Sequence, residues 1–310
     1  MMNTSIAVAT SIAPGRIHAQ QEAVTSWQRL GWRVLAVNPP AEIDGLAPKF
    51  PGVEFVPAIR DAGDEHGRHL VYLDDLIAFL RTTDEGICGI VNADVRFQVD
   101  TKFREFLGRH GKGGIVFGSR IDVTPADHQE GHEYDQGFDF FFFAREVADR
   151  FPPSSFCLGL PGWDYWLPMI GLLHGIPVRH LLTPVAFHSL HEATWSVGEV
   201  KKFERILFDD LSALCSQMGT KSLGSHLGLR MHEEGREFWA ALQRFIDGHG
   251  EPLFIQDTVH GVTISRDRYD RLKASLKHRE EELRSLVTSR SWRYSAPFRQ
   301  FMAAVRSWRF

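Results

Sequence analysis

The sequence predicts an α/β fold, in which a mainly parallel sheet is flanked by helices and followed by a C-terminal helical extension. Two observations lead to this prediction. Short apolar runs without helical periodicity, such as residues 87–91, are typical of strands that are buried on both faces of a parallel sheet. These runs alternate with segments of helical periodicity, and that alternation indicates βαβ units.

The expected elements follow one another in this alternating order. Apolar runs that end in small or polar residues predict strands at residues 6–10, 32–37, 53–59, 87–91, 115–117 and 178–182. Apolar residues at helical spacing predict helices at residues 18–30, 73–80, 103–109 and 166–173. Gly31 and Gly111 end the first and third of these helices. A β-rich run at residues 185–187 completes the predicted core.

Polar residues end several of the predicted strands. The carboxyl ends of parallel strands meet at one edge of the sheet, where ligands of open α/β sheets bind. We therefore expect a nucleotide site lined by these polar residues: Thr10, Ser11, Asn38, Arg60, Asn92 and Asp94. The alternative is that these residues end their strands without any binding role, because polar residues are common at strand ends.

The tip Asn92-Ala93-Asp94 is the most informative of these strand ends. A carboxylate at this edge is a candidate ligand for a hard cation and, through the cation, for a diphosphate. The alternative is an Asx-type turn in which Asp94 is simply solvated.

A second signal is the segment Gly162-Trp163-Asp164-Tyr165-Trp166. An acid flanked by tryptophans lies in a low-dielectric environment, which raises its pKa toward the range of a general base. The indole faces suit stacking on sugar rings. The alternative is that Asp164 caps the following helix and the aromatic rings fill the core.

Charge and cysteine content exclude other classes of protein. The net charge of −4 provides no overall basic field for nucleic acid, so we expect no nucleic-acid partner. The three cysteines are widely spaced and form no C-x-x-C pair, which indicates reduced thiols in the cytoplasm. We expect neither a signal peptide nor a transmembrane helix.

These features together resemble the GT-A type, nucleotide-sugar-dependent glycosyltransferases of the bacterial polysaccharide kind, whose fold is Rossmann-like. The resemblance extends over residues 3–195. The matching segments are Thr10-Ser11-Ile12-Ala13-Pro14, Asn92-Ala93-Asp94 where such enzymes carry D-x-D, Gly162-Trp163-Asp164, and His188 after the last core strand.

The resemblance implies a role for each matching residue. Asp94 and His188 would hold Mn²⁺ or Mg²⁺ against the diphosphate of a nucleoside-diphosphate sugar, and Asp164 would be the base of an inverting enzyme. The acceptor would be a glycan or a lipid-linked glycan, contacted by Trp163, Tyr165 and Asp139. Asn92 stands where the family has an acid, so metal dependence could be weak or lost. An inert module that binds nucleotide sugars or glycans is therefore the alternative.

His188 and His191 also fit a zinc-dependent hydrolase. Two imidazoles three residues apart can share a metal on a helix, whereas on a strand they are expected to face opposite sides. The β-rich run before His188 favours the strand.

We expect three segments in the chain. Residues 1–197 form the transferase domain, residues 198–262 a helical cap, and residues 263–310 a charged helix with a basic and aromatic tail. The cap contains helices at residues 199–218 and 233–246, the second broken by residues 247–250. The tail, residues 283–310, has six arginines and no acid, which predicts peripheral contact with an anionic membrane. A partner-binding or frayed tail is the alternative.

Overall fold

The computed structural model describes residues 5–124, 131–134, 136–191, 196–228 and 236–255. The chain divides into two compact units, residues 1–262 and residues 263–310, and all the described residues belong to the first. The charged helix and the basic tail predicted for residues 263–310 therefore lie outside the described residues.

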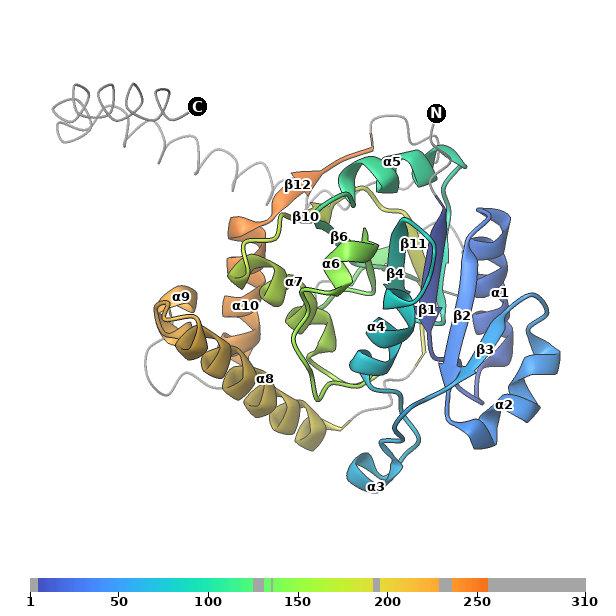
Figure 1. Ribbon diagram of the computed structural model, residues 1–310, viewed down its shortest axis with the longest axis horizontal. Coiled ribbons are helices and arrows are strands. Elements are labelled where there is room, and N and C mark those ends of the chain that lie inside the picture. Colours follow the sequence, from blue (N-terminus) through green and yellow to red (C-terminus); the bar gives the residue numbers. More distant parts are fainter. Residues whose placement is uncertain (1–4, 125–130, 135, 192–195, 229–235, 256–310) are drawn as a thin grey trace, which may run out of the picture. The chain divides into compact units, whose positions relative to one another are not determined.

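The core of the described part is an eight-stranded sheet in the order β12-β10-β6-β9-β4-β1-β2-β3 (Figure 1). Its strands are β1 (Ile6–Thr10), β2 (Arg33–Asn38), β3 (Glu54–Pro57), β4 (Ile87–Val91), β6 (Ile115–Gly118), β9 (Phe140–Ala144), β10 (Val178–Leu181) and β12 (Glu251–Leu253). All neighbours are parallel except β9, which is antiparallel to β4 and β6. The predicted α/β fold class with a mainly parallel sheet is confirmed.

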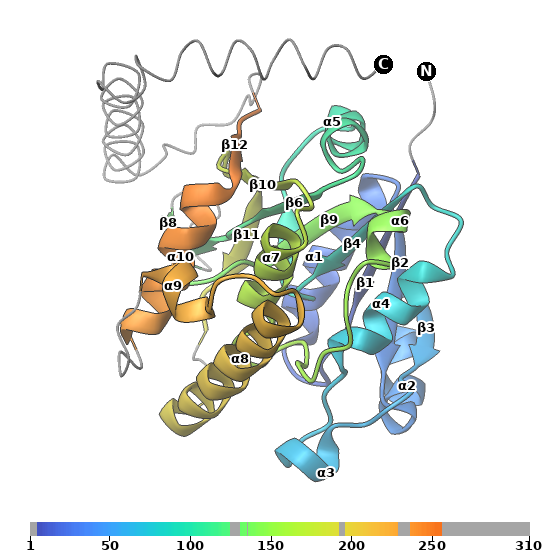
Figure 2. The ribbon, with the colours of Figure 1, turned by 60° about the vertical axis from the view of Figure 1, so that its left-hand side comes forward.

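Helices flank this sheet, as predicted. They include α1 (Ile17–Arg29), α2 (Pro40–Leu46), α3 (Gly63–His66), α4 (Leu73–Arg81), α5 (Lys102–His110), α6 (Arg145–Ala148) and α7 (Trp163–Leu173), with a 3₁₀ turn at Ala47–Lys49. The connection through α1 leads from β1 to β2, and the connection through α4 leads back past β1 to β4. Because such crossovers are right-handed, the two helices cover opposite faces of the sheet, as Figure 2 shows.

A second, four-stranded sheet was not predicted, and it builds the site. It consists of β5 (Val95–Phe97), β7 (Ile121–Val123), β8 (Gly131–Glu133) and β11 (Ala186–Ser189), in the order β5-β11-β7-β8. In β11, His188 lies opposite Val95 of β5 and opposite Asp122 of β7. Residues that are distant in the sequence are thereby brought next to Asp94, which immediately precedes β5.

The segment after β11 is mostly helical, as predicted, but it also extends the main sheet. It contains α8 (Val197–Gln217), α9 (Leu223–Leu227) and α10 (Arg236–His249), and α8 and α10 contact α7. Ser196 and Glu199 form a capping box that begins α8. Helix α10 ends at His249, within the predicted break at residues 247–250. Strand β12 then pairs with β10, so this segment is more than a helical cap.

Two further predictions can be compared with the structure. The cysteines Cys88, Cys157 and Cys215 are free and buried, in agreement with the absence of a disulfide framework. Among the described helices, none is both long enough and apolar enough to span a bilayer.

Candidate active site

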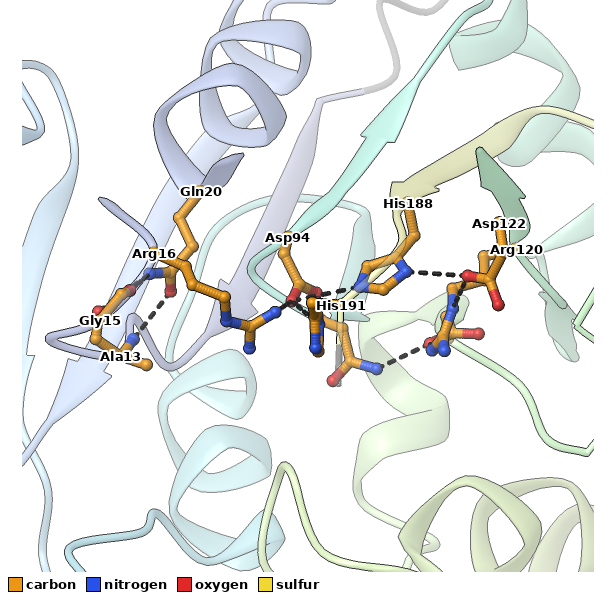
Figure 3. A network of polar contacts seen from close by, with 11 residues as sticks. Ala13, Gly15, Arg16, Gln20, Asp94, Arg120, Asp122, His188 and His191 are labelled. Atoms are coloured by element: carbon orange, nitrogen blue, oxygen red, sulfur yellow. Dashed lines mark hydrogen bonds and ion pairs between the residues drawn. The ribbon is translucent and has the colours of Figure 1, made fainter. Parts of the chain in front are cut away.

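The site is centred on Asp94, which lies in the turn between β4 and β5. Oδ2 of Asp94 is 3.5 Å from Nε2 of His188 and 3.5 Å from Nε2 of His191 (Figure 3). The three ligand atoms lie within 4.8 Å of one another. Asp94 and His188, ninety-four positions apart in the sequence, therefore meet at the carboxyl edge of the sheet.

His191 is a third member of the cluster, and the expectation that it faces away from His188 is wrong. Strand β11 ends at Ser189, so the alternation of side chains along a strand no longer applies at His191. The two imidazole rings are 4.7 Å apart between centroids and both face Asp94. The sequence had suggested this pair only for a hydrolase.

The donor set of this cluster fits a divalent cation. One carboxylate oxygen and two imidazole nitrogens are available, and the imidazoles favour a transition metal, so the set suits Mn²⁺ better than Mg²⁺. Burial by itself would raise the pKa of Asp94. Hydrogen bonds from His188 and His191, and then the charges of His188 and Arg16, outweigh it and lower the pKa of Asp94 well below its usual value. Asp94 is therefore ionised, as a metal ligand must be.

Arg16 places a guanidinium on the same carboxylate. Its Nη1 is 3.1 Å from Oδ2 of Asp94. Arg16 precedes α1 in a left-handed conformation, with φ of 52°, which is strained for a residue other than glycine. The buried side chain of Gln20 holds the preceding loop through hydrogen bonds with Ala13 and Gly15. A cation and a helix N-terminus thus converge where an anionic ligand is favoured.

Arg120 links several carboxylates behind this cluster. Its Nε donates to Oδ1 of Asp122 at 2.7 Å, and its Nη1 donates to Oδ1 of Asp139 at 2.6 Å. The guanidinium also lies 4.0 Å above the ring of Tyr134. Asn92 donates through Nδ2 to the same oxygen of Asp139 at 2.9 Å. Neither Arg120 nor Asp122 was singled out in the sequence.

Asp139 reaches this edge because β9 is antiparallel to its neighbours. The residue before β9 lies between the ends of β4 and β6, and its backbone bonds Asn92 and Gly118. Asp139 is only 2% exposed, and among the described residues its Oδ2 has no hydrogen-bond partner. The predicted contact of Asp139 with an acceptor stays a prediction.

Asp164 lies beside Asp139, in the first turn of α7. Its Oδ2 accepts a hydrogen bond from the backbone N–H of Phe138 at 3.2 Å. A Cβ on Gly137 would lie 2.2 Å from this oxygen, so only glycine fits there. Burial and the charge of Asp139 raise the pKa of Asp164 to about 7, against the lowering effect of backbone hydrogen bonds. A carboxyl group that titrates near neutral pH can act as a general base.

The aromatic residues around Asp164 fill the core. Trp163 is 3% exposed and packs against Phe141, and Tyr165 is 4% exposed and donates to Gln243. Helix α7 begins at Trp163 rather than at the predicted position 166, and both rings are buried in its first turn. Neither ring presents a face for sugar stacking, so the structure favours the architectural alternative for these two residues.

The polar residues that end β1 and β2 form hydrogen bonds with the backbone at the carboxyl edge of the sheet. Thr10 is fully buried and donates to the carbonyl of Val91 at 2.7 Å. Asn38 is also fully buried and exchanges two hydrogen bonds with the backbone of Ile12. These contacts join β1 to β4 and hold the loop after β1 against β2.

Ser11 and Arg60 have different surroundings. Ser11 is half-buried directly after β1. Arg60 lies beyond β3, where it pairs with Asp74 and Asp75 and stacks over Tyr72. Nucleotide contacts by both residues stay predictions.

Comparison with known proteins gives matches in structure alone. No protein-family model matches the chain, and no curated protein matches it in sequence. Similar solved structures include the mannosyltransferase PcManGT from Pyrobaculum calidifontis in complex with GDP-Man and Mn²⁺, with 13% identity, TM-score 0.43 and coverage of 97% of this chain and 86% of that one. Another is TarS 1-349 from S. aureus, with 10% identity, TM-score 0.36 and coverage of 79% of this chain and 83% of that one. A third is HddC from Yersinia pseudotuberculosis, with 11% identity, TM-score 0.32 and coverage of 66% of this chain and 99% of that one. The function proposed below rests on the geometry of the described residues.

Proposed function

We propose that this chain transfers a sugar from a nucleoside-diphosphate sugar to a glycan or lipid-linked acceptor. The observation that carries the proposal is the cluster of Asp94, His188 and His191 at the carboxyl edge of the main sheet. This edge is where open α/β sheets bind nucleotides, and a divalent cation stabilises the negative charge that develops on a departing diphosphate.

On the donor side, Asp94, His188 and His191 would hold the cation, with Mn²⁺ favoured. The cation supplies positive charge that stabilises the departing diphosphate. Arg16 adds a second cation next to Asp94, and the N-terminus of α1 adds its dipole. These groups bind and orient the donor.

On the acceptor side, Asp164 would take the proton of the attacking hydroxyl in an inverting transfer. Its buried position keeps the pKa near 7, so the ionised form is accessible at neutral pH. Asp139 lies close by, and its Oδ2, which has no hydrogen-bond partner within the part of the chain that the structure describes, would orient a sugar hydroxyl by accepting a hydrogen bond.

A metal-dependent hydrolase is the second candidate, because the structure brings His188 and His191 to one carboxylate. Two imidazoles and one acid are also the ligand set of catalytic zinc sites that activate water. Such an enzyme would cleave its substrate without an acceptor and would purify with stoichiometric zinc. An inert nucleotide-sugar module would bind the donor without product.

The test measures product from the full chain. A panel of nucleotide sugars is first screened by thermal shift with and without Mn²⁺, because a ligand raises apparent stability by mass action. Release of nucleoside diphosphate is then measured with glycan acceptors. We expect Mn²⁺-dependent release that Asp94→Asn abolishes and that the same change at the exposed Asp84 preserves. Release that is independent of acceptor would favour a hydrolase, and binding without release would favour the inert module.

Membrane contact and a cytoplasmic location are predictions from the sequence. Residues 283–310 would contact an anionic bilayer and so bring the site to a lipid-linked acceptor. Truncation after Thr288 is expected to release the protein from anionic liposomes. Equal binding by the truncated form would exclude this role.

A further inference from the structure

A carboxylate contacts the side of His188 that faces away from Asp94. Oδ1 of Asp122 is 2.8 Å from Nδ1 of His188, and the pairing of β11 with β7 places these two residues opposite each other. Both ring nitrogens of His188 face a carboxylate, and an ionised carboxylate can only accept hydrogen bonds. The contact of Nδ1 with Asp122, at 2.8 Å, is shorter than the contact of Nε2 with Asp94, at 3.5 Å, so a neutral ring is expected to carry its proton on Nδ1. In the neutral ring, the lone pair is then on Nε2, which faces Asp94.

Asp122 is itself held in place. Arg120 donates to the same Oδ1 at 2.7 Å, and the guanidinium is fixed by Asp139 and by the ring of Tyr134. Because Asp139 also accepts from Asn92, one guanidinium connects the far side of His188 to the residue two positions before Asp94. Figure 3 shows the contacts of Arg120 with Asp122, of Asp122 with His188, and of His188 with Asp94.

We propose that Asp122 is a positioning residue that fixes the tautomer and the ring orientation of His188, so that Nε2 is presented to a divalent cation at Asp94, and that Arg120 holds Asp122 in that position. This inference rests on the metal site of the proposed function, but not on any sugar chemistry. Carboxylates behind metal-binding histidines act in this way, and their loss weakens metal affinity by about 10–100-fold.

The first test is a double-mutant cycle on Mn²⁺ affinity, measured by titration of the full chain without nucleotide. We expect Asp122→Asn to weaken Mn²⁺ binding by about 10–100-fold in the wild-type background. In the His188→Ala background the same change is expected to alter the affinity by less than about twofold, because the residue acts through His188. Asp84→Asn is the matched control for the loss of one acid.

The cycle separates this role from a merely structural one. Equal losses in both backgrounds, or no loss in either, would overturn the proposal. A wild-type chain without Mn²⁺ affinity would overturn it together with the metal site. If sugar transfer fails but the cycle shows coupling, the inference holds and the proposed reaction does not.

The second test needs no substitution and therefore does not depend on the folding of a variant. The tautomer of His188 can be read from ¹⁵N chemical shifts of the metal-free chain, above the pH at which the ring deprotonates. We expect the proton on Nδ1. A neutral ring with its proton on Nε2 would overturn the proposal, because that nitrogen could not then accept a cation.

Discussion

Replacing Asp164 with asparagine separates the effect of this residue on stability from its effect on catalysis. The stability of the fold is expected to rise, whereas the turnover is expected to fall. Burial and the charge of Asp139 raise the pKa of Asp164 from 3.8 to about 7. One pKa unit corresponds to about 1.4 kcal/mol, so the ionised carboxylate lowers the stability of the fold by about 4 kcal/mol. The amide has no charge to bury.

The sign of the pH dependence follows from linkage. Below about pH 4 the carboxyl group is protonated in both the folded and the unfolded state, so its burial as a charge does not lower the free energy of unfolding. As pH rises from about 4 to about 7, the unfolded state loses the proton first, so the wild-type protein loses stability. Above about pH 7 the loss is complete. Asp164→Asn is therefore expected to be more stable than wild type by about 1–3 kcal/mol at about pH 8, less than the full value because the amide accepts weaker hydrogen bonds.

Activity is expected to change in the other direction. If Asp164 is the base, its replacement lowers turnover by about 10²–10⁴-fold, and wild-type kcat/KM rises with pH to a plateau above about 7. Urea unfolding at several pH values measures the stability, and nucleoside diphosphate release measures the activity. A variant that is less stable at every pH, or that keeps wild-type turnover, would refute the reasoning. Asp84→Asn is expected to change neither quantity.

The remaining predictions concern the donor side. Arg16→Gly relieves the backbone strain of a left-handed residue but adds conformational freedom to the unfolded chain, so stability is expected to change by less than about 1 kcal/mol. Donor affinity, measured by calorimetry, is expected to fall about tenfold because the guanidinium is lost. His191→Ala is expected to weaken Mn²⁺ binding at least about tenfold in a direct titration, and unchanged affinity would remove it from the ligand set. Asn92→Asp removes the hydrogen bond to buried Asp139 and sets two carboxylates against each other. It is expected to lower stability by about 1–3 kcal/mol in urea, and a gain in stability or in Mn²⁺ affinity would contradict this reasoning.

Six strands of the main sheet were predictable because each is a distinct apolar run, whereas β9 and β12 were not among the predicted strands. β1 and β4 begin and end where the sequence predicts, since the runs are bounded by polar residues or glycine. The second sheet was not predictable. Its strands β5, β7 and β8 have three residues each, too few for any periodicity to be recognised.

Only part of the candidate site could be predicted from the sequence. The proximity of Asp94 and His188 followed from a resemblance and not from their spacing. The orientation of His191 depends on where β11 ends, and strand ends are the least certain part of a sequence prediction. Arg120 and Asp122 carry no motif, and only strand pairing places Asp122 against His188. For Trp163 and Tyr165, composition could not distinguish a sugar platform from a core.

The amide at Asn92 gains a physical explanation from its surroundings. Asp139 is buried and already receives one guanidinium, and Asn92 adds a second donor to the same oxygen. An acid at position 92 would be repelled there, and the third ligand atom near Asp94 comes instead from the ring of His191. A divalent cation held by one carboxylate and two neutral imidazoles keeps one positive charge, whereas two carboxylates would cancel it. Because a diphosphate is attracted by that remaining charge, the departure from D-x-D at Asn92 is compatible with a working donor site.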